Sequence, residues 1–132
     1  MTDVDRLVAA ALAARRFNLS LGPRVCMDLQ EPTHHELQLL AVRSKGRGGE
    51  EDLLIWTRRL VLQSIVGWIG VRQSDLLAAE PVDLEPDPPV DFDPRLIEPL
   101  LDANVGWTEQ VRDALLARVH ARRARVEAAA KN

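Results

Sequence analysis

The stretch WTRRLVLQSIVGWIGV, from Trp56 to Val71, contains the longest candidate for a continuous apolar segment in this chain of 132 residues. Its large apolar side chains recur at helical spacing, and from Leu60 to Ile69 they would surround a helix on nearly every side. A helix of this kind lies in the middle of a fold, so we predict a central, buried helix over residues 50–69. The run is shorter than the roughly 18 to 20 residues that a membrane span requires, and we expect no membrane contact.

The sequence on either side of this segment predicts four further helices and one hairpin. Thr2 is placed to cap a first helix, and Thr33 with Glu36 three residues later forms a capping box for a second. Asp93, followed by a proline, restarts the chain as a helix. Apolar and polar residues alternate on both sides of Gly22, which is typical of two short strands. The predicted elements are helices over 2–15, 32–44, 50–69, 93–103 and 108–130, and a β-hairpin over 16–30.

An acidic, proline-rich connector lies between the predicted central helix and the last two helices. Five prolines occur from Pro81 to Pro94, which excludes a regular helix, and we expect residues 80–92 to run extended over the surface or to be mobile. Residues 80–102 carry eight acids and one base, whereas residues 103–132 carry six bases and three acids. The two segments can therefore attract each other within one chain or between two copies.

The chain is short enough to form a single domain over residues 1–132. We predict a mostly α class, with five helices and a small N-terminal β-hairpin that needs a helix packed against it. Trp107, directly before the last helix, is expected to pack as a hydrophobic staple. The residues expected to form the structural core are Trp56, Leu60, Ile65, Trp68, Trp107 and Leu115.

No motif in the chain points to catalysis, and we expect neither enzyme activity nor a cofactor or metal ion. His34 and His35 are adjacent, so on a helix they point about 100° apart and do not form the i, i+4 pair that chelates a metal. The loop at 46–49 lacks the Gly-Lys-Ser/Thr of a phosphate-binding loop, and acidic residues follow it. The carboxylates between Asp83 and Asp93 lie among prolines, with nothing apolar to separate their pKa values.

The last predicted helix changes character along its length. Its first half carries an apolar stripe, whereas the part beyond Val119 is mostly alanine and arginine, with good helix propensity but little to bury. We expect this basic tail to become ordered on a protein partner. Nucleic acid is a less favoured partner, because the net charge is −3 and no aromatic residue lies among the arginines. The candidate partner-binding residues are Arg118, Arg122, Arg123 and Arg125.

The order of these segments resembles that of the tail assembly chaperones of long-tailed bacteriophages and prophages. Val25 to Leu37 (VCMDLQEPTHHEL) is similar to the family's strand leading into a helix that begins at Pro-Thr. Val66 to Val71 (VGWIGV) resembles the Trp-x-Gly-Val end of the family's central helix, and Val90 to Leu101 (VDFDPRLIEPLL) resembles its short Asp-Pro segment. A long, alanine-rich terminal helix follows in both. The chain departs from the family mainly in its long acidic connector.

The resemblance implies a non-enzymatic function in tail morphogenesis. Proteins of this family coat the tape measure protein, keep it soluble and recruit tail tube subunits, so the implied partners are the tape measure protein and the major tail tube protein. The implied location is the host cytoplasm, with the protein absent from the mature virion. We also expect the chain to form homo-oligomers while it acts.

Two other functions are compatible with a small, helical and charged chain. One is that of a structural head-to-tail adaptor protein of the phage particle. The other is that of a host-directed regulator that binds DNA through Arg118 to Arg125. A chaperone is absent from purified particles, an adaptor is present at fixed stoichiometry, and a DNA-binding regulator shows salt-dependent affinity.

Overall fold

The computed structural model describes residues 2–45 and 52–131. In this part of the chain six α-helices accompany a small three-stranded antiparallel sheet, which confirms the mostly α class and corrects the predicted count of five helices. The helices are α1 (Asp3–Ala13), α2 (His34–Arg43), α3 (Leu53–Ser64), α4 (Gln73–Leu77), α5 (Ile97–Ala103) and α6 (Trp107–Ala130). The strands are β1 (Arg16–Ser20), β2 (Cys26–Gln30) and β3 (Ile65–Ile69), and two 3-10 turns are η2 (Pro81–Asp83) and η3 (Pro94–Leu96).

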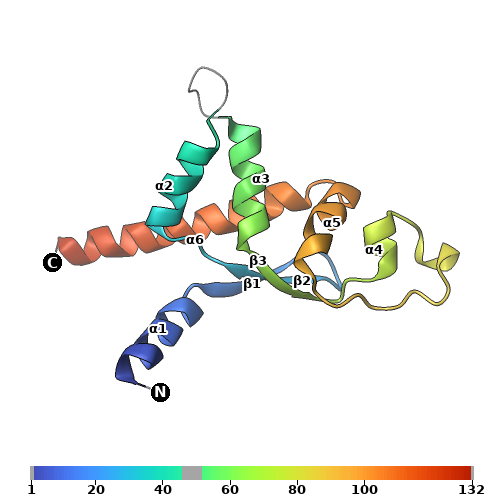
Figure 1. Cartoon of the computed structure of the whole chain (residues 1–132), viewed down its shortest axis with the longest axis horizontal. Coiled ribbons are helices and arrows are strands. Elements are labelled where there is room, and N and C mark those ends of the chain that lie inside the picture. Colours follow the sequence, from blue (N-terminus) through green and yellow to red (C-terminus); the bar gives the residue numbers. More distant parts are fainter. Residues whose placement is uncertain (1, 46–51, 132) are drawn as a thin grey trace.

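The helices project from the sheet in different directions (Figure 1). α2 and α3 stand side by side, and α3 also packs on α6. The C-terminal half of α6 extends away from the body, and α1 leaves the sheet on the side away from α2 and α3 (Figure 1). Within the described residues, no helix is both long enough and apolar enough to cross a membrane.

Capping side chains set where the N-terminal helices begin. The Thr2 hydroxyl accepts a hydrogen bond from the Asp5 amide while the Asp5 carboxylate accepts one from the Thr2 amide, and Thr33 and Glu36 repeat this reciprocal arrangement before α2. The Asp52 carboxylate accepts from two amides in the first turn of α3. The predicted helix start at residues 50 and 51 lies outside the described residues.

The predicted helix over 50–69 is wrong in its last five residues. α3 ends at Ser64, and Ile65–Ile69 form β3, which pairs antiparallel with β2 in the sheet order β1-β2-β3. Two β-branched residues followed by Gly67 favour an extended chain over a helix. Gly67 lies opposite Asp28, where a Cβ atom would approach the Asp28 carboxylate oxygen to 2.8 Å. A short run that is apolar on both faces suits a buried strand as well as a buried helix, and the tertiary pairing selects the strand.

The core is built on the inner side of β2. Met27 and Leu29 are fully buried there, and α3, β3, α5 and α6 all supply side chains to the same cluster. Of the six residues named from the sequence, Leu60, Ile65, Trp68 and Leu115 are buried, whereas Trp56 and Trp107 are half-buried and pack against the cluster.

The proline-rich connector packs against the end of β3. The Trp68 indole N–H donates to the Val90 carbonyl oxygen over 2.9 Å, and the Trp68 ring meets Phe92 edge-on with the ring centroids 4.9 Å apart. The Val90 amide donates to the carbonyl of Val71, and Asp87 accepts from the amide and hydroxyl of Ser74. These contacts hold the connector in place and carry the chain from α4 to α5.

Gly70 makes the sharp exit from β3 that this packing requires. It has a φ of +80°, and a Cβ atom there would overlap the carbonyl oxygen of Arg24. Gly106, before α6, has a similar φ of +91° but no atom closer than 4.0 Å to the place of a Cβ. The two glycines therefore separate the cost of backbone strain from that of steric overlap.

We predict that Gly70→Ala destabilises the fold by about 3 kcal/mol or more, because strain and overlap add at this position. Gly106→Ala, as the matched control, should cost only about 1 kcal/mol, from strain alone. Chemical denaturation monitored by tryptophan fluorescence measures both. Equal losses in the two variants would contradict the close approach of Gly70 to Arg24.

Candidate functional site

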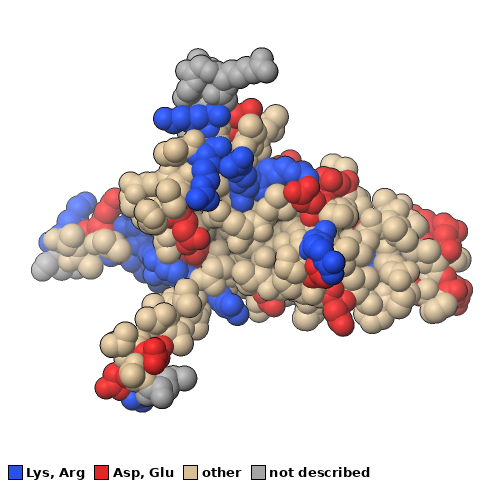
Figure 2. Space-filling view, in the orientation of Figure 1, with Lys and Arg blue, Asp and Glu red and all other residues tan. Residues whose placement is uncertain are grey.

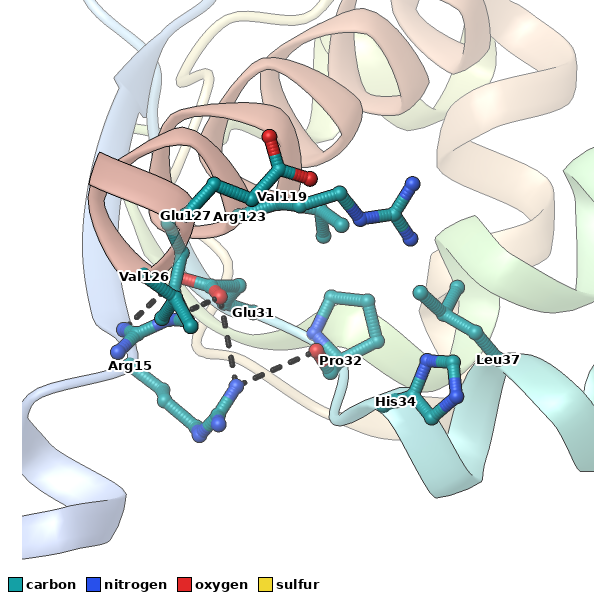
Figure 3. Close-up of a pocket in the computed structure, with 10 residues that line it drawn as sticks. Arg15, Glu31, Pro32, His34, Leu37, Val119, Arg123, Val126 and Glu127 are labelled. Carbon is teal, nitrogen blue, oxygen red and sulfur yellow. Dashed lines mark hydrogen bonds and ion pairs between the residues drawn. The ribbon is translucent and has the colours of Figure 1, made fainter. Parts of the chain in front are cut away.

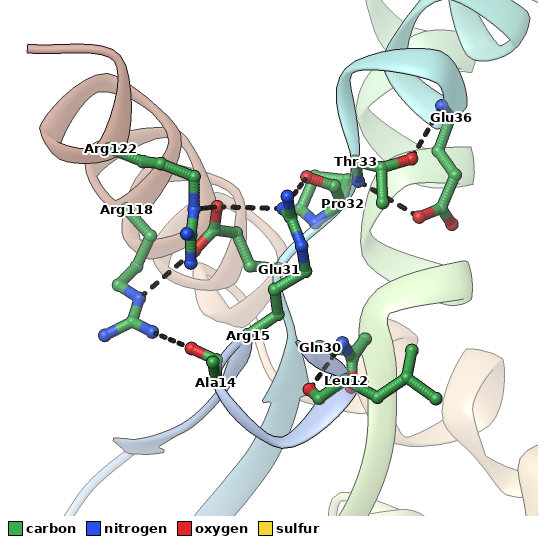
Figure 4. A network of polar contacts seen from close by, with 10 residues as sticks. All are labelled: Leu12, Ala14, Arg15, Gln30, Glu31, Pro32, Thr33, Glu36, Arg118 and Arg122. Carbon is green, nitrogen blue, oxygen red and sulfur yellow. Dashed lines mark hydrogen bonds and ion pairs between the residues drawn. The ribbon is translucent and has the colours of Figure 1, made fainter. Parts of the chain in front are cut away.

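A single buried carboxylate connects three segments that are distant in the sequence. Glu31 directly follows β2, and its side chain is 1% exposed. Arg15 reaches it from the junction of α1 and β1. Arg118 and Arg122, four residues apart and therefore on one face of α6, reach it from that helix, at the left of Figure 4.

The contacts of Glu31 differ in quality. Arg122 makes two hydrogen bonds to the carboxylate, of 2.7 and 3.2 Å, which raise the pKa of the Arg122 guanidinium. The Arg15 guanidinium donates to the carboxylate over 3.3 Å and to the Pro32 carbonyl over 3.4 Å. Arg118 places its Nε 3.5 Å from the carboxylate, an ion pair rather than a hydrogen bond, and its guanidinium lies 4.7 Å from the centroid of the Phe17 ring. Three positive groups thus share one negative group.

A groove opens beside this cluster, between α2 and the C-terminal half of α6 (Figure 3). Its volume is about 380 Å³. The apolar part of its wall consists of Pro32, which precedes α2, of Leu37 in α2, and of Val119 and Val126 in α6. The polar part consists of Arg15, Glu31, His34, Arg122, Arg123 and Glu127. The groove combines an apolar wall with a basic rim and can accept an amphipathic segment that carries acidic residues.

The four arginines predicted as a partner-binding set have two different environments. Arg118 and Arg122 are half-buried against Glu31, and the ion pairs with this carboxylate neutralise part of their positive charge. Arg123 lines the groove, and Arg125 is exposed; neither forms an ion pair with a described residue. Figure 2 shows basic side chains along α6 and near α2 and α3, and acidic ones over the end of the molecule formed by the connector. The internal role of Arg118 and Arg122 was not visible in the sequence, because Glu31 is about ninety positions away from them.

Exposed apolar side chains form two further surfaces. In α1 no residue is buried, and Val4, Leu7, Val8 and Leu12 are between 54 and 69% exposed. The second surface, at the distal ends of α2 and α3, consists of Leu39, Val42, Leu53, Leu54 and Ile55, with Leu54 83% exposed. The helical periodicity of α1 was predicted from the sequence. That its apolar stripe stays exposed, with no partner among the described residues, was not predicted.

The histidines and the cysteine, which could indicate a metal site, do not form a cluster in the described part of the chain. Among the described residues no group of three or more His, Cys, Asp or Glu side chains could hold a metal ion. His34 and His35 are both exposed at the start of α2, and Cys26 lies half-buried in β2. The glycine-rich loop at 46–49 lies outside the described residues.

Comparisons with models of protein families, with curated proteins and with solved structures find no match to this chain. The site is therefore interpreted from its own geometry: a basic cluster around one carboxylate, an adjoining groove, and exposed apolar helix faces.

We predict that Glu31→Gln lowers the free energy of unfolding by about 2 to 3 kcal/mol, because it leaves three clustered arginines without their counter-charge. The control is Glu98→Gln, which removes a surface partner of Arg58 that is 57% exposed and should cost about 1 kcal/mol or less. Urea denaturation of both variants provides the measurement. A cost at Glu31 no larger than that at Glu98 would contradict a structural role for the cluster.

Proposed function

We propose that the chain is a non-enzymatic tail assembly chaperone of a bacteriophage or prophage, which binds the tape measure protein and recruits tail tube subunits. The observation that carries this proposal is the large amount of apolar side chain left exposed on projecting helices. Monomeric soluble proteins rarely expose extended apolar patches, and such patches usually mark contacts with other proteins. A chaperone needs surfaces of this kind in order to cover the apolar stripes of a helical client.

The three segments that resemble the chaperone family support the proposal by where they lie. Met27, in the first segment, is paired with Trp68 in the second. Trp68 in turn donates a hydrogen bond to Val90 and meets Phe92 edge-on, both of them in the third segment. The three segments, although separate in the sequence, thus pack against one another. If this chain and the chaperone family share a fold, that packing is a sufficient physical reason for the three segments to occur in the same order in both.

The distal ends of α2 and α3 form the surface that best suits a helical client. Between α2 and the C-terminal half of α3 lies a second hollow of about 380 Å³, lined by Leu40, Arg43, Arg59, Leu62 and Gln63. An apolar helix face seats on such a surface through residues spaced three and four apart. Arg123 and Arg125 would contribute charge to partner contacts from α6, since Arg118 and Arg122 already hold Glu31.

The test is to tag the chain in cells that produce the phage particle, and to identify co-purifying proteins by mass spectrometry. Purified particles are probed for the chain in the same experiment. Co-purification with the tape measure or tail tube protein, together with absence from particles, is the expected result. Presence in the particle at fixed stoichiometry would overturn the proposal and favour the head-to-tail adaptor, and salt-dependent DNA binding without these partners would favour the regulator.

We predict that Val42→Ser combined with Leu54→Ser weakens recovery of the client by about tenfold or more, because two apolar contacts of the interface are lost. Both side chains are exposed, so the melting temperature should stay nearly unchanged. Val82→Ser is the control, since Val82 is 76% exposed but lies on the connector. Full client recovery by the double variant would exclude this surface as the binding site.

A further inference from the structure

The helix α1 needs a partner that the described part of its own chain does not provide. It has 11 residues, a length at which an isolated helix is marginal in water. Its apolar stripe, Val4, Leu7, Val8 and Leu12, is more than half exposed at every position. The capping box at Thr2 starts the helix but buries no apolar surface. The stripe is therefore suited to contact with another molecule.

The chain holds α1 in a fixed direction away from its own groove. At the C-terminal end of α1, the Gln30 side chain donates to the Leu12 carbonyl over 3.2 Å, and Arg118 donates to the Ala14 carbonyl over 3.4 Å (Figure 4). The Glu31 amide donates to the Arg15 carbonyl over 2.8 Å. Only Ala14 and Arg15 separate α1 from β1, so folding α1 back over the groove would break these bonds.

The groove between α2 and α6 has the chemistry that α1 would fit. Its apolar wall, from Pro32 and Leu37 to Val119 and Val126, matches the aliphatic stripe of α1. The charges are also complementary. Over residues 2–13, α1 carries Asp3 and Asp5 against Arg6 and is net negative. In and beside the groove, Arg15, Arg118, Arg122 and Arg123 outnumber Glu31 and Glu127.

We propose that α1 of one chain docks into the groove between α2 and α6 of a second copy, and that the exchange is reciprocal and forms a two-fold dimer. A helix of 11 residues is about 16 Å long. Two such helices in two grooves bury roughly 1,200 Å² in total, which is at the lower end of stable protein interfaces. Each chain supplies one helix and one groove, so the contact closes on itself and leaves neither surface unpaired.

This dimer is formed by the purified chain alone and does not require the function proposed above. Its test needs no client, so the two proposals fail independently. Sedimentation equilibrium over a wide range of concentration should give a dimer of the 14.7 kDa chain that dissociates on dilution. A chain that is monomeric at every concentration would overturn the proposal.

Substitutions on the two faces locate the contact. Leu7→Ser with Val8→Ser on α1, and separately Val126→Asp in the groove, should each raise the dimer dissociation constant by about tenfold or more. Leu77→Ser with Val82→Ser removes two comparably exposed apolar side chains elsewhere and should leave the dissociation constant unchanged. Because none of these residues is buried, an unchanged melting temperature at high dilution shows that each variant is folded. A dimer that persists unweakened in the Leu7 and Val8 variant would contradict the exchange of α1.

Cross-linking between differently labelled chains tests the reciprocal geometry. In a Cys26→Ser background, a chain with Val8→Cys is mixed with a chain carrying Val126→Cys and treated with a short bis-maleimide. The exchange predicts covalent heterodimers from this mixture, and few from a mixture in which Val82→Cys replaces Val126→Cys. Equal yields from the two mixtures would show that α1 is not seated in the groove. If α1 instead cross-linked selectively to an added client protein, the helix would be assigned to that partner and the dimer proposal would be overturned.

Discussion

The carboxylate of Glu31 joins the end of β2 to the start of β1 and to the middle of α6, and the directions of two helices, α1 and α6, depend on it. Breaking a fully buried ion pair typically costs about 3 to 5 kcal/mol, and the cost here is lower because the three arginines are 26 to 37% exposed. Replacing a whole buried cluster by apolar residues is often neutral. The contribution of the cluster is therefore mainly geometric. By holding Arg118 and Arg122, Glu31 determines where the second half of α6 lies, and by holding Arg15 it determines where α1 leaves the sheet.

The same geometry explains why so much apolar surface stays exposed. The core occupies the inner side of a small sheet, and α3, α5 and α6 already fill it around Met27 and Leu29. α1, the distal ends of α2 and α3, and the C-terminal half of α6 project beyond this core and cannot reach it. A fold with several unpartnered helix faces is suited to contacts with other chains, both with a client and with a second copy of itself. The proposed client surface lies on α2 and α3, whereas the proposed dimer uses α1 and the groove between α2 and α6. Of the residues assigned to client contacts, Arg123 also lines that groove.

Local signals in the sequence predicted most of the helices correctly. The two capping boxes and the Asp93-Pro94 turn have partners within three residues, so their geometry follows from the sequence itself. The third strand could not be predicted in this way. Ile65 to Ile69 is apolar on both faces, so the spacing of its apolar residues does not distinguish a strand from a helix. Of the candidate site, the four arginines were identified, but Glu31, the partner of Arg118 and Arg122, was not. Its position after a strand resembles that of any acidic residue before a helix.

The sequence by itself determined the helical character of the chain, the positions where its N-terminal helices begin and the amphipathic pattern of α1, because these depend on interactions between residues a few positions apart. Only the tertiary structure decided that Ile65 to Ile69 is a strand beside β2, that the proline-rich connector is held by Trp68, and that two of the tail arginines are bound to Glu31. These features rest on contacts between residues about twenty to ninety positions apart. Such contacts form only when the whole chain is folded, and no local pattern in the sequence specifies them.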